Sequence, residues 1–495
     1  MPIALRRART LALTAAAVLA VAPAVLPPRL WSATGAHRWL GLSLLCLVGI
    51  GIASQRWITH ASLAAHRGCG RTTAGDVVLL VALPVYVLAF GAGRGHTSGD
   101  NAATRLLGPL IVREGTIDLS RLPEYQTEPL HYSATRVGDR VFPTYPLGTA
   151  LLYVPYAAVS LAAYGDEWRP RHINRWERHL SALLAAAATA FLFLGAREVC
   201  GELAALGTAF VFAFCTTVFS SMSQALWSTT GEVFLLCLAL WMVLPEEAPP
   251  FRCLVAGFAV GGAFLCRPTA VVAAVVLGLV LFLRRRSDLP WYAAGALSTM
   301  AGVCVVLYRL YGHPLGGYGL MHRGTWGHNI FEGLVGSLLS PSRGLLPFYP
   351  YLLFCAAAWR RLQPTPALRR WLVGALATVG AYYVMVSVFD HWTGGFSIGP
   401  RLMTEGAPFL AILTVPAWLQ LSRRSWWRAA FLLSVAFAAA TQLLAVYSDR
   451  AERANFQLTD SAAFLSLRQS QLAAIWCVPC PRGAGGSSGP GDEGR

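Results

Sequence analysis

Asp100 is the residue of this chain best placed for acid–base chemistry. It stands in Gly99-Asp100-Asn101, near the start of a long segment (93–145) that follows an apolar run. A carboxylate held at a fixed height above an apolar layer is able to act as a general base toward a hydroxyl, or to bind a divalent metal. Ordinary surface charge is the alternative, because an Asp in contact with water costs little.

Residues 101–113, directly after Asp100, have the pattern of an amphipathic helix. One helical face carries the apolar side chains Leu106, Leu107, Leu110 and Ile111. A helix of this kind lies in the plane of a membrane interface. It would hold Asp100 in place, and it makes the neighbouring Arg105 a candidate binding residue.

Three arginines in unusual surroundings are candidates for binding an anion. They are Arg267, within an apolar stretch, Arg343, after Ser-Pro-Ser, and Arg401, at the end of a Gly- and aromatic-rich segment. The guanidinium suits a phosphate because its forked donors pair with two oxygens. For Arg267, a loop position or snorkelling to the surface agrees equally well with the sequence.

Four further candidate binding residues accompany them: Tyr145, Glu232, Asp390 and Trp392. Tyr145 also suits a ring anchored at the membrane interface. Glu232 would equally cap a helix start, where the helix dipole favours negative charge. Trp392 and the nearby Phe396 offer flat faces to a sugar ring or to the lipid boundary.

Apolar helices must position these residues. Of the 495 residues, 55% are hydrophobic and 13% charged, and the mean hydropathy is +0.50; soluble domains carry roughly 25% charged residues. In lipid each backbone amide must be paired within its own segment, so we predict an all-α polytopic membrane protein with about 12–14 transmembrane helices. The expected spans are 9–25, 39–54, 74–92, 146–164, 179–198, 203–221, 226–244, 252–284, 290–310, 344–358, 371–389, 403–420 and 428–447.

The net charge of +16 does not indicate nucleic acid, because the arginines are spread over short loops. Under the positive-inside rule, the arginines of 6–9, 169–178, 284–286, 360–370 and 423–428 are expected inside the cell. Segments 93–145, 311–343 and 390–402 are then expected outside.

One conflict arises from this topology. Five apolar runs lie between residues 179 and 284, where two cytoplasmic ends require an even number. A half-helix would solve it, but we favour a single helix over 252–284 that is broken at Arg267-Pro268, since Pro disrupts the helical ladder.

The two ends of the chain add little. We expect 1–480 to form one transmembrane domain whose first helix is retained, although the N-terminus also resembles a cleaved signal peptide. The Gly-rich tail 481–495 is expected to be disordered. Cys477 and Cys480 form a lone CxxC, which is a weak sign of metal or redox chemistry.

Taken together, the motifs resemble bacterial members of the GT-C superfamily of membrane glycosyltransferases, and are similar to protein mannosyltransferases and to arabinosyl and lipid A sugar transferases. The features that carry the resemblance are Asp100 in the first large outer loop, the juxtamembrane helix, Tyr-Pro-Leu-Gly from Tyr145, Arg267-Pro268, Ser-Pro-Ser-Arg-Gly around Arg343, and Trp392-Thr-Gly-Gly through Gly-Pro-Arg401. Together they cover most of residues 74–420.

The resemblance implies an inverting transfer of a sugar from a polyprenyl-phosphate donor to a glycan, lipid or protein acceptor. The active site would face outward from the bacterial cytoplasmic membrane, with Asp100 as the base and the arginines as a phosphate clamp. The family often has paired acids, whereas Asn101 and Ala102 follow Asp100 here. No cofactor is therefore required, and a divalent metal is left open.

Two other classes of function also use apolar helices. A lipid or solute transporter or flippase would also need a broken helix and a buried Arg, but the inverted repeats common in transporters are not evident here. A non-catalytic protein of envelope assembly is the other alternative. The sequence specifies neither the sugar nor the acceptor.

Overall fold

The computed structural model describes residues 74–92, 99–164, 170–247, 249–322, 325, 327, 329–421, 425–448, 450–455 and 464–476. The first two expected spans, the Cys477 and Cys480 pair and the tail 481–495 lie outside these residues.

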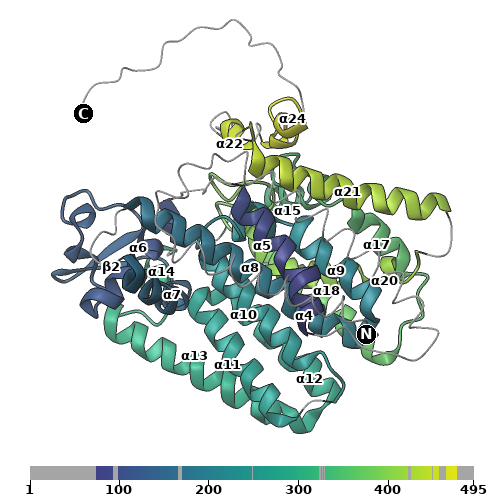
Figure 1. Ribbon diagram of the computed structural model, residues 1–495, viewed down its shortest axis with the longest axis horizontal. Coiled ribbons are helices and arrows are strands. Elements are labelled where there is room, and N and C mark those ends of the chain that lie inside the picture. The colour runs from purple at the N-terminus through teal and green to yellow at the C-terminus, as the bar shows by residue number, and fades with distance from the viewer. Residues whose placement is uncertain are drawn as a thin grey trace, which may run out of the picture.

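Helices make up most of the described part of the chain, which contains only two short strands (Figure 1); this confirms the prediction of an all-α polytopic membrane protein. Three described helices are long and apolar enough to cross a membrane: Ile173–Cys200, Arg286–Tyr311 and Trp426–Tyr447. Shorter apolar helices pack around them.

The helices that form the body of the bundle are α5 (Leu83–Gly91, continuing α4, Ala74–Val77, and η1, Val78–Ala82), α8 (Pro170–Cys200), α9 (Glu202–Phe214), α10 (Ser228–Val243), α11 (Pro250–Cys266), α12 (Val271–Arg284), α13 (Leu289–Tyr311), α17 (Tyr351–Trp359), α18 (Pro366–Ser387) and α21 (Ser425–Tyr447).

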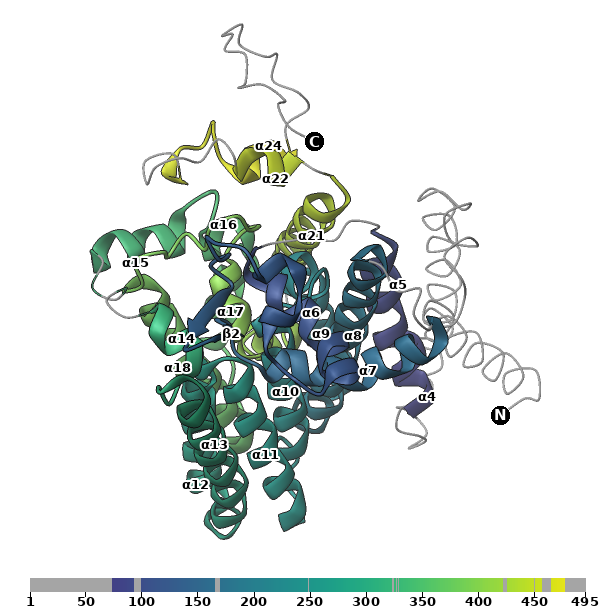
Figure 2. The same cartoon turned by 90° about the vertical axis from the view of Figure 1, so that its left-hand side faces the viewer.

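The bundle has two ends of different character, seen at the left and at the right of Figure 1; Figure 2 faces the left-hand end. We call the end that carries residues 99–147 the Asp100 end, and the end with the short connections after α8, α10, α12 and α17 the opposite end. Short helical segments fill the remaining connections: η6 (Val218–Met222), η7 (Pro268–Ala270), η8 (Arg286–Asp288), α16 (Leu345–Phe348), η9 (Arg401–Gly406), α19 (Ala407–Ile412) and α20 (Val415–Trp418).

The long loop after α5 forms a compact cap on the Asp100 end. It contains η2 (Gly99–Asn101), α6 (Ala102–Glu114), η3 (Leu119–Arg121), η4 (Pro123–Tyr125) and the strands β1 (Ala134–Val137) and β2 (Arg140–Pro143), which pair antiparallel with Ala134 opposite Pro143. The helix α6 covers almost the residues for which an amphipathic helix is predicted. Its apolar face is buried, with Leu107 and Leu110 in a separate core cluster beside Leu307 and Tyr311 of α13.

The next helix, α7 (Gly148–Tyr164), does not cross the bundle, although a span is expected at 146–164. At its start, a Cβ on Gly148 would collide with the backbone N of Cys266. At its other end, the ring of Tyr164 contacts that of Trp176, with 5.7 Å between the centroids.

Residues 174–177 lie beside the Asp100 loop. Asn174 Oδ1 accepts from Arg105 Nη1 at 3.0 Å, and Glu177 Oε1 accepts from the side chain of Asn101. Both ends of α7 are therefore at the Asp100 end, where α7 packs along α6 (Figure 2). A 17-residue apolar helix has the same sequence pattern whether it faces lipid along its length or packs on another helix.

Arg267 marks the turn of a helical hairpin and not a break in one helix over 252–284. The turn joins α11 to η7 and α12, and the far ends of both helices meet at the opposite end. There Arg285 Nη2 lies 3.7 Å from Cys253 Sγ, and Arg284 Nη1 donates to the carbonyl of Leu244 at 3.0 Å.

These two findings remove the conflict in the predicted topology. Because α7 stays at the Asp100 end, α8 begins there. Five helices, α8 to α12, then run in alternating directions, so that the fifth ends at Arg284 at the opposite end. Arg175 and Arg178, the arginines of this stretch whose side chains the structure describes, consequently lie at the same end of the bundle as Asp100. Arg178, for example, donates to the carbonyl of Phe90 at the end of α5, at 2.9 Å.

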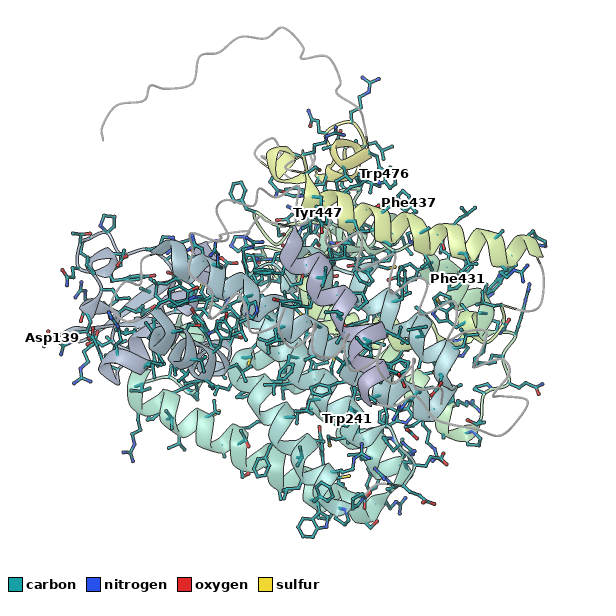
Figure 3. All side chains as sticks on the ribbon, viewed as in Figure 1. Asp139, Trp241, Phe431, Phe437, Tyr447 and Trp476 are labelled. Carbon is teal, nitrogen blue, oxygen red and sulfur yellow. The ribbon has the colours of Figure 1, made fainter. Side chains whose placement is uncertain are left out.

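The last part of the chain returns to the Asp100 end. This end also holds α14 (Gly316–Met321), α15 (Ile330–Leu339), α22 (Arg450–Asn455) and α24 (Gln471–Trp476). The ring of Trp476 stacks on Phe437 of α21 at 5.2 Å between centroids, and Tyr447 donates to the carbonyl of Leu88 at 2.8 Å (Figure 3). The end of α21 is thereby fixed against α5, next to the loop that carries Asp100.

Candidate functional site

The turn that carries Asp100 is held in place by Glu177 of α8. The side chain of Asn101, 1% exposed, donates to Glu177 Oε1 on α8, and the same oxygen accepts from the backbone N of Leu226 at 3.0 Å. A buried carboxylate is stabilised by such donors. Glu177 therefore ties the Asp100 turn to the segment that precedes α10.

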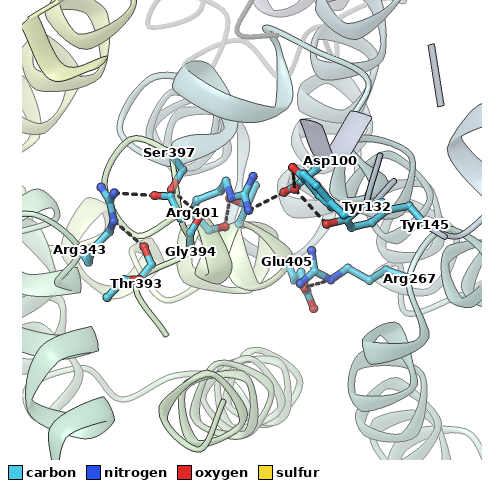
Figure 4. Close-up of polar contacts among 12 residues, drawn as sticks. Asp100, Tyr132, Tyr145, Arg267, Arg343, Thr393, Gly394, Ser397, Arg401 and Glu405 are labelled. Carbon is cyan, nitrogen blue, oxygen red and sulfur yellow. Dashed lines mark hydrogen bonds and ion pairs between the residues drawn. The ribbon is translucent and has the colours of Figure 1, made fainter. Parts of the chain in front are cut away.

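The carboxylate of Asp100 is held by three side chains from three parts of the chain (Figure 4). Its Oδ1 accepts from the hydroxyls of Tyr132 and Tyr145, at 2.9 Å each. Its Oδ2 accepts from Arg401 Nη2 at 3.0 Å. The guanidinium of Arg401 also lies over the ring of Trp227, 4.4 Å from the centroid, a geometry that attracts a cation to the ring face.

These partners determine the charge of Asp100. Burial would raise its pKa, but Arg401 and the hydroxyls of Tyr145 and Tyr132 outweigh burial and lower the pKa below its ordinary value. Asp100 is therefore a carboxylate at neutral pH, able to accept a proton from a group that enters the site.

A second charge pair lies beside the first. Arg267, at the turn between α11 and η7, forms an ion pair with Glu405 of η9, with 2.5 Å between Nε and Oε1. The side chain of Glu405 is 1% exposed, whereas that of Arg267 is 17% exposed. Glu232 of α10 is fully buried within electrostatic reach of Arg267, and neither of its carboxylate oxygens has a hydrogen-bond partner.

Both arginines and Asp100 face one cavity of about 500 Å³ at the Asp100 end. Its walls come from the Asp100 loop, the start of α10, the turn after α11, α14 and the segment after α18. The cavity thus brings a carboxylate, two guanidinium groups and several aromatic rings to the same space. Such a site can bind an anion and remove a proton within a few ångströms of it.

Comparison with known proteins gives a likeness in fold and no match in sequence. Neither a protein-family model nor a curated protein matches this chain. The fold is similar to the crystal structure of ArnT from Cupriavidus metallidurans bound to undecaprenyl phosphate. The two chains share 13% sequence identity with a TM-score of 0.46, over 81% of this chain and 74% of that one. At this distance the likeness concerns the helical arrangement alone, and the function proposed below rests on the residues of this chain.

Four of the nine predicted site residues meet at the cavity: Asp100, Tyr145, Arg267 and Arg401. Five do not line it: Arg105, Glu232, Arg343, Asp390 and Trp392. Arg105 bonds to Asn174, as described above, and Glu232 is enclosed behind Arg267. Asp390 stands beside the cavity-lining His391, and its backbone N donates to the carbonyl of Thr325 at 3.1 Å.

Arg343 and Trp392 have structural environments. The guanidinium of Arg343 donates to the carbonyls of Thr393 and Gly395, at 2.5 and 2.8 Å, and to Asn455 Oδ1 at 2.8 Å. It holds the loop that leads to Arg401 and is not directed at the cavity (Figure 4). The ring of Trp392, 3% exposed, packs against Gly336 of α15, where a Cβ would collide with it.

Several cavity residues were not predicted as site residues. They are Tyr132, Trp227, Tyr318, His322 and His391, together with Glu405 behind Arg267. Glu405 was identifiable from the sequence, since it is a lone acid within an apolar run. The tyrosines and the tryptophan were not identifiable as site residues, because Tyr and Trp are common at any membrane interface.

In the part of the chain that the structure describes, no three His, Cys, Asp or Glu side chains come together as metal ligands would.

Proposed function

We propose that this protein is a membrane glycosyltransferase that moves a sugar from a polyprenyl-phosphate donor to an extracytoplasmic acceptor, with Asp100 as the base. One observation carries the proposal: Asp100 shares its cavity with Arg267 and Arg401. A sugar bound to a phosphate needs a cationic site for its leaving group and a carboxylate near its anomeric carbon, and the cavity has both.

The reaction would proceed as a single displacement. The acceptor oxygen or nitrogen attacks the anomeric carbon, the bond from that carbon to the phosphate oxygen breaks, and the electron pair leaves with the polyprenyl phosphate. Asp100 takes the proton of the acceptor. The ionised state of Asp100 favours this role, since a base must be unprotonated when the acceptor arrives.

The two arginines would stabilise the departing phosphate. Arg401 donates to Asp100 with Nη2 and lies on Trp227, so its other donors are available to a phosphate. Arg267 reaches the cavity while Glu405 holds its Nε. Fixed donors aimed at developing negative charge lower the barrier because they need no reorganisation during the reaction.

The charge of the connections supports an outward-facing site. The opposite end of the bundle carries arginines on short connections: Arg284, Arg285, Arg286, Arg360, Arg361, Arg369 and Arg370. Short loops rich in arginine stay in the cytoplasm. The Asp100 end would then face away from the cytoplasm of a bacterial inner membrane, where a glycan, lipid or protein acceptor is met.

A transfer assay on membranes tests the proposal. Membranes holding wild type or Asp100→Asn are given radiolabelled polyprenyl-phosphate sugars, and labelled product is counted. We expect Asp100→Asn to lower the rate by roughly 10²–10⁴-fold, the usual contribution of a general base. Asp139→Asn is the matched control, because Asp139 is an exposed acid at the tip of the β1–β2 hairpin, outside the cavity. Equal transfer by wild type and Asp100→Asn would refute the assignment of the base.

A further inference from the structure

One wall of the cavity is a row of rings that the displacement step does not use. Between ring centroids, Tyr145 lies 6.4 Å from Tyr318, Tyr318 lies 4.2 Å from His322, His322 lies 5.4 Å from Phe389, and Phe389 lies 5.7 Å from His391. All five residues line the cavity. The row starts at Tyr145, which donates to Asp100, and ends at the exposed His391. We call Tyr318, His322, Phe389 and His391 the ring wall.

The ring wall is built from two segments that are fastened to each other. Tyr318 belongs to α14 and His322 follows it, while Phe389 and His391 follow α18. The backbone N of Asp390 donates to the carbonyl of Thr325 at 3.1 Å. In addition, a Cβ on Gly317 would lie 2.8 Å from Thr144 Cα, so α14 fits closely against the strand end before Tyr145. The rings are therefore held in place before any ligand binds.

The chemistry of the ring wall fits a sugar better than an isoprenoid chain. The protein itself provides a partner for one nitrogen of the ring wall, since His322 Nδ1 lies 3.4 Å from Thr325 Oγ1. An isoprenoid has no group that pairs with the Tyr318 hydroxyl, with the other nitrogen of His322 or with the imidazole of His391. A sugar ring has C–H faces that pack on rings and hydroxyls that donate to and accept from imidazole nitrogens. Apolar surface with a few convergent polar groups is the usual composition of a small-molecule site.

The imidazole of His322 is neutral at pH 7. Burial, the Arg267 guanidinium and His391 lower its pKa to about 4, against the opposing effect of the Asp100 carboxylate. A neutral imidazole has one donor and one acceptor nitrogen, which suits the hydroxyls of a sugar.

We propose that the ring wall binds a sugar ring beside Asp100, either the sugar of the donor or a sugar of the acceptor. The inference rests on the proposed function, and it names the residues of the cavity that hold the sugar. It also differs from the expectation that Trp392 supplies the flat face, since Trp392 packs on α15 instead.

The test uses Phe389→Leu, which keeps apolar volume but removes the flat ring. Its matched control is Phe331→Leu, because Phe331 is 75% exposed on α15 and does not line the cavity. Dissociation constants are measured on the purified full-length protein for three probes. The probes are bare polyprenyl phosphate, polyprenyl-phosphate mannose and a soluble mannose oligosaccharide.

We expect wild type to bind polyprenyl-phosphate mannose on the order of tenfold more tightly than the bare lipid, as one ring contact and its hydrogen bonds would provide. Phe389→Leu should remove that difference and leave the bare lipid unchanged, while Phe331→Leu should behave like wild type. If only the oligosaccharide binding depends on Phe389, the sugar of the acceptor is the occupant.

Two results would overturn the inference. If Phe389→Leu weakens binding of the bare lipid as much as binding of the sugar-bearing lipid, the ring wall contacts the isoprenoid chain. If the binding of neither sugar probe depends on Phe389, the ring wall does not bind a sugar. By contrast, failure of every lipid phosphate to bind wild type would refute the proposed function itself.

Discussion

Arg401 Nη2 donates to Asp100 Oδ2 at 3.0 Å, although the two residues are 301 positions apart in the sequence. The pair is partly exposed, with 15% of the Arg401 side chain and 22% of the Asp100 side chain accessible. It therefore lies at the surface of the cavity, where a phosphate is able to compete with Asp100 for the guanidinium.

Arg401→Gln should move the pH dependence of the reaction. Burial raises the pKa of Asp100, and Arg401 lowers it together with the hydroxyls of Tyr145 and Tyr132. In the variant only the two hydroxyls oppose burial. The pKa of Asp100 then rises, and the acidic limb of kcat/KM moves to higher pH. A pH profile on wild type and Arg401→Gln measures the shift. Arg105→Gln serves as the control, because Arg105 bonds to Asn174 outside the cavity; an unmoved limb in Arg401→Gln would contradict the role of the pair.

Gly99→Ala should lower activity without disturbing the fold. A Cβ at position 99 would collide with the hydroxyl and ring of Tyr132, which donates to Asp100 at 2.9 Å. The ring has to move away, and a misplaced catalytic group costs roughly 10²-fold per ångström. Transfer and thermal unfolding are measured together. Gly302→Ala is the control, because a Cβ there meets nothing within 4 Å; full activity of Gly99→Ala would show that Tyr132 is dispensable.

Arg343→Met should destabilise the protein more than it affects donor affinity. Arg343 is 3% exposed and satisfies two loop carbonyls and Asn455. Leaving buried acceptors unpaired costs about 1–3 kcal/mol. We expect a lower unfolding temperature in detergent, measured against Arg309→Met, whose arginine is exposed on α13. If Arg343→Met unfolds like wild type but no longer binds the donor, Arg343 has a direct role in binding, contrary to this prediction.

Single cysteines should locate the two ends of the bundle. Asn174 is exposed at the Asp100 end, and Glu247 is exposed at the opposite end. With an impermeant maleimide added to intact spheroplasts, Asn174→Cys should react and Glu247→Cys should react only after permeabilisation. The wild type reports labelling of the native cysteines. The reverse pattern would place the cavity in the cytoplasm and exclude an extracytoplasmic acceptor.

The residue types of the site were easier to predict than their neighbours. Asp100, Arg267 and Arg401 stand out because charged residues are scarce in an apolar chain, and the structure brings all three to one cavity. The partner of Arg267 was not predictable, because Glu405 follows Arg401 in the chain and only the fold sets it against the turn after α11. Arg343 was predicted to bind an anion, but it bonds to backbone carbonyls. The sequence does not distinguish these two roles, because an isolated arginine suits both.

The predicted topology was wrong at one helix, α7, for a similar reason. Hydropathy identifies α7 as apolar but does not tell packing on α6 from contact with lipid. That single error reversed the side assigned to Arg175 and Arg178. It also led to the prediction of a broken helix at Arg267, where the structure has a helical hairpin.

The distance along the chain between Asp100 and Arg401 also bears on biosynthesis. The ribosome emits the loop with Asp100 early, while η9 and its arginine are inserted only after α18. Until then the carboxylate lacks its counter-ion and the cavity lacks its last wall. A chain that ends before η9 would lack both Arg401 and the part of the cavity wall that this segment provides.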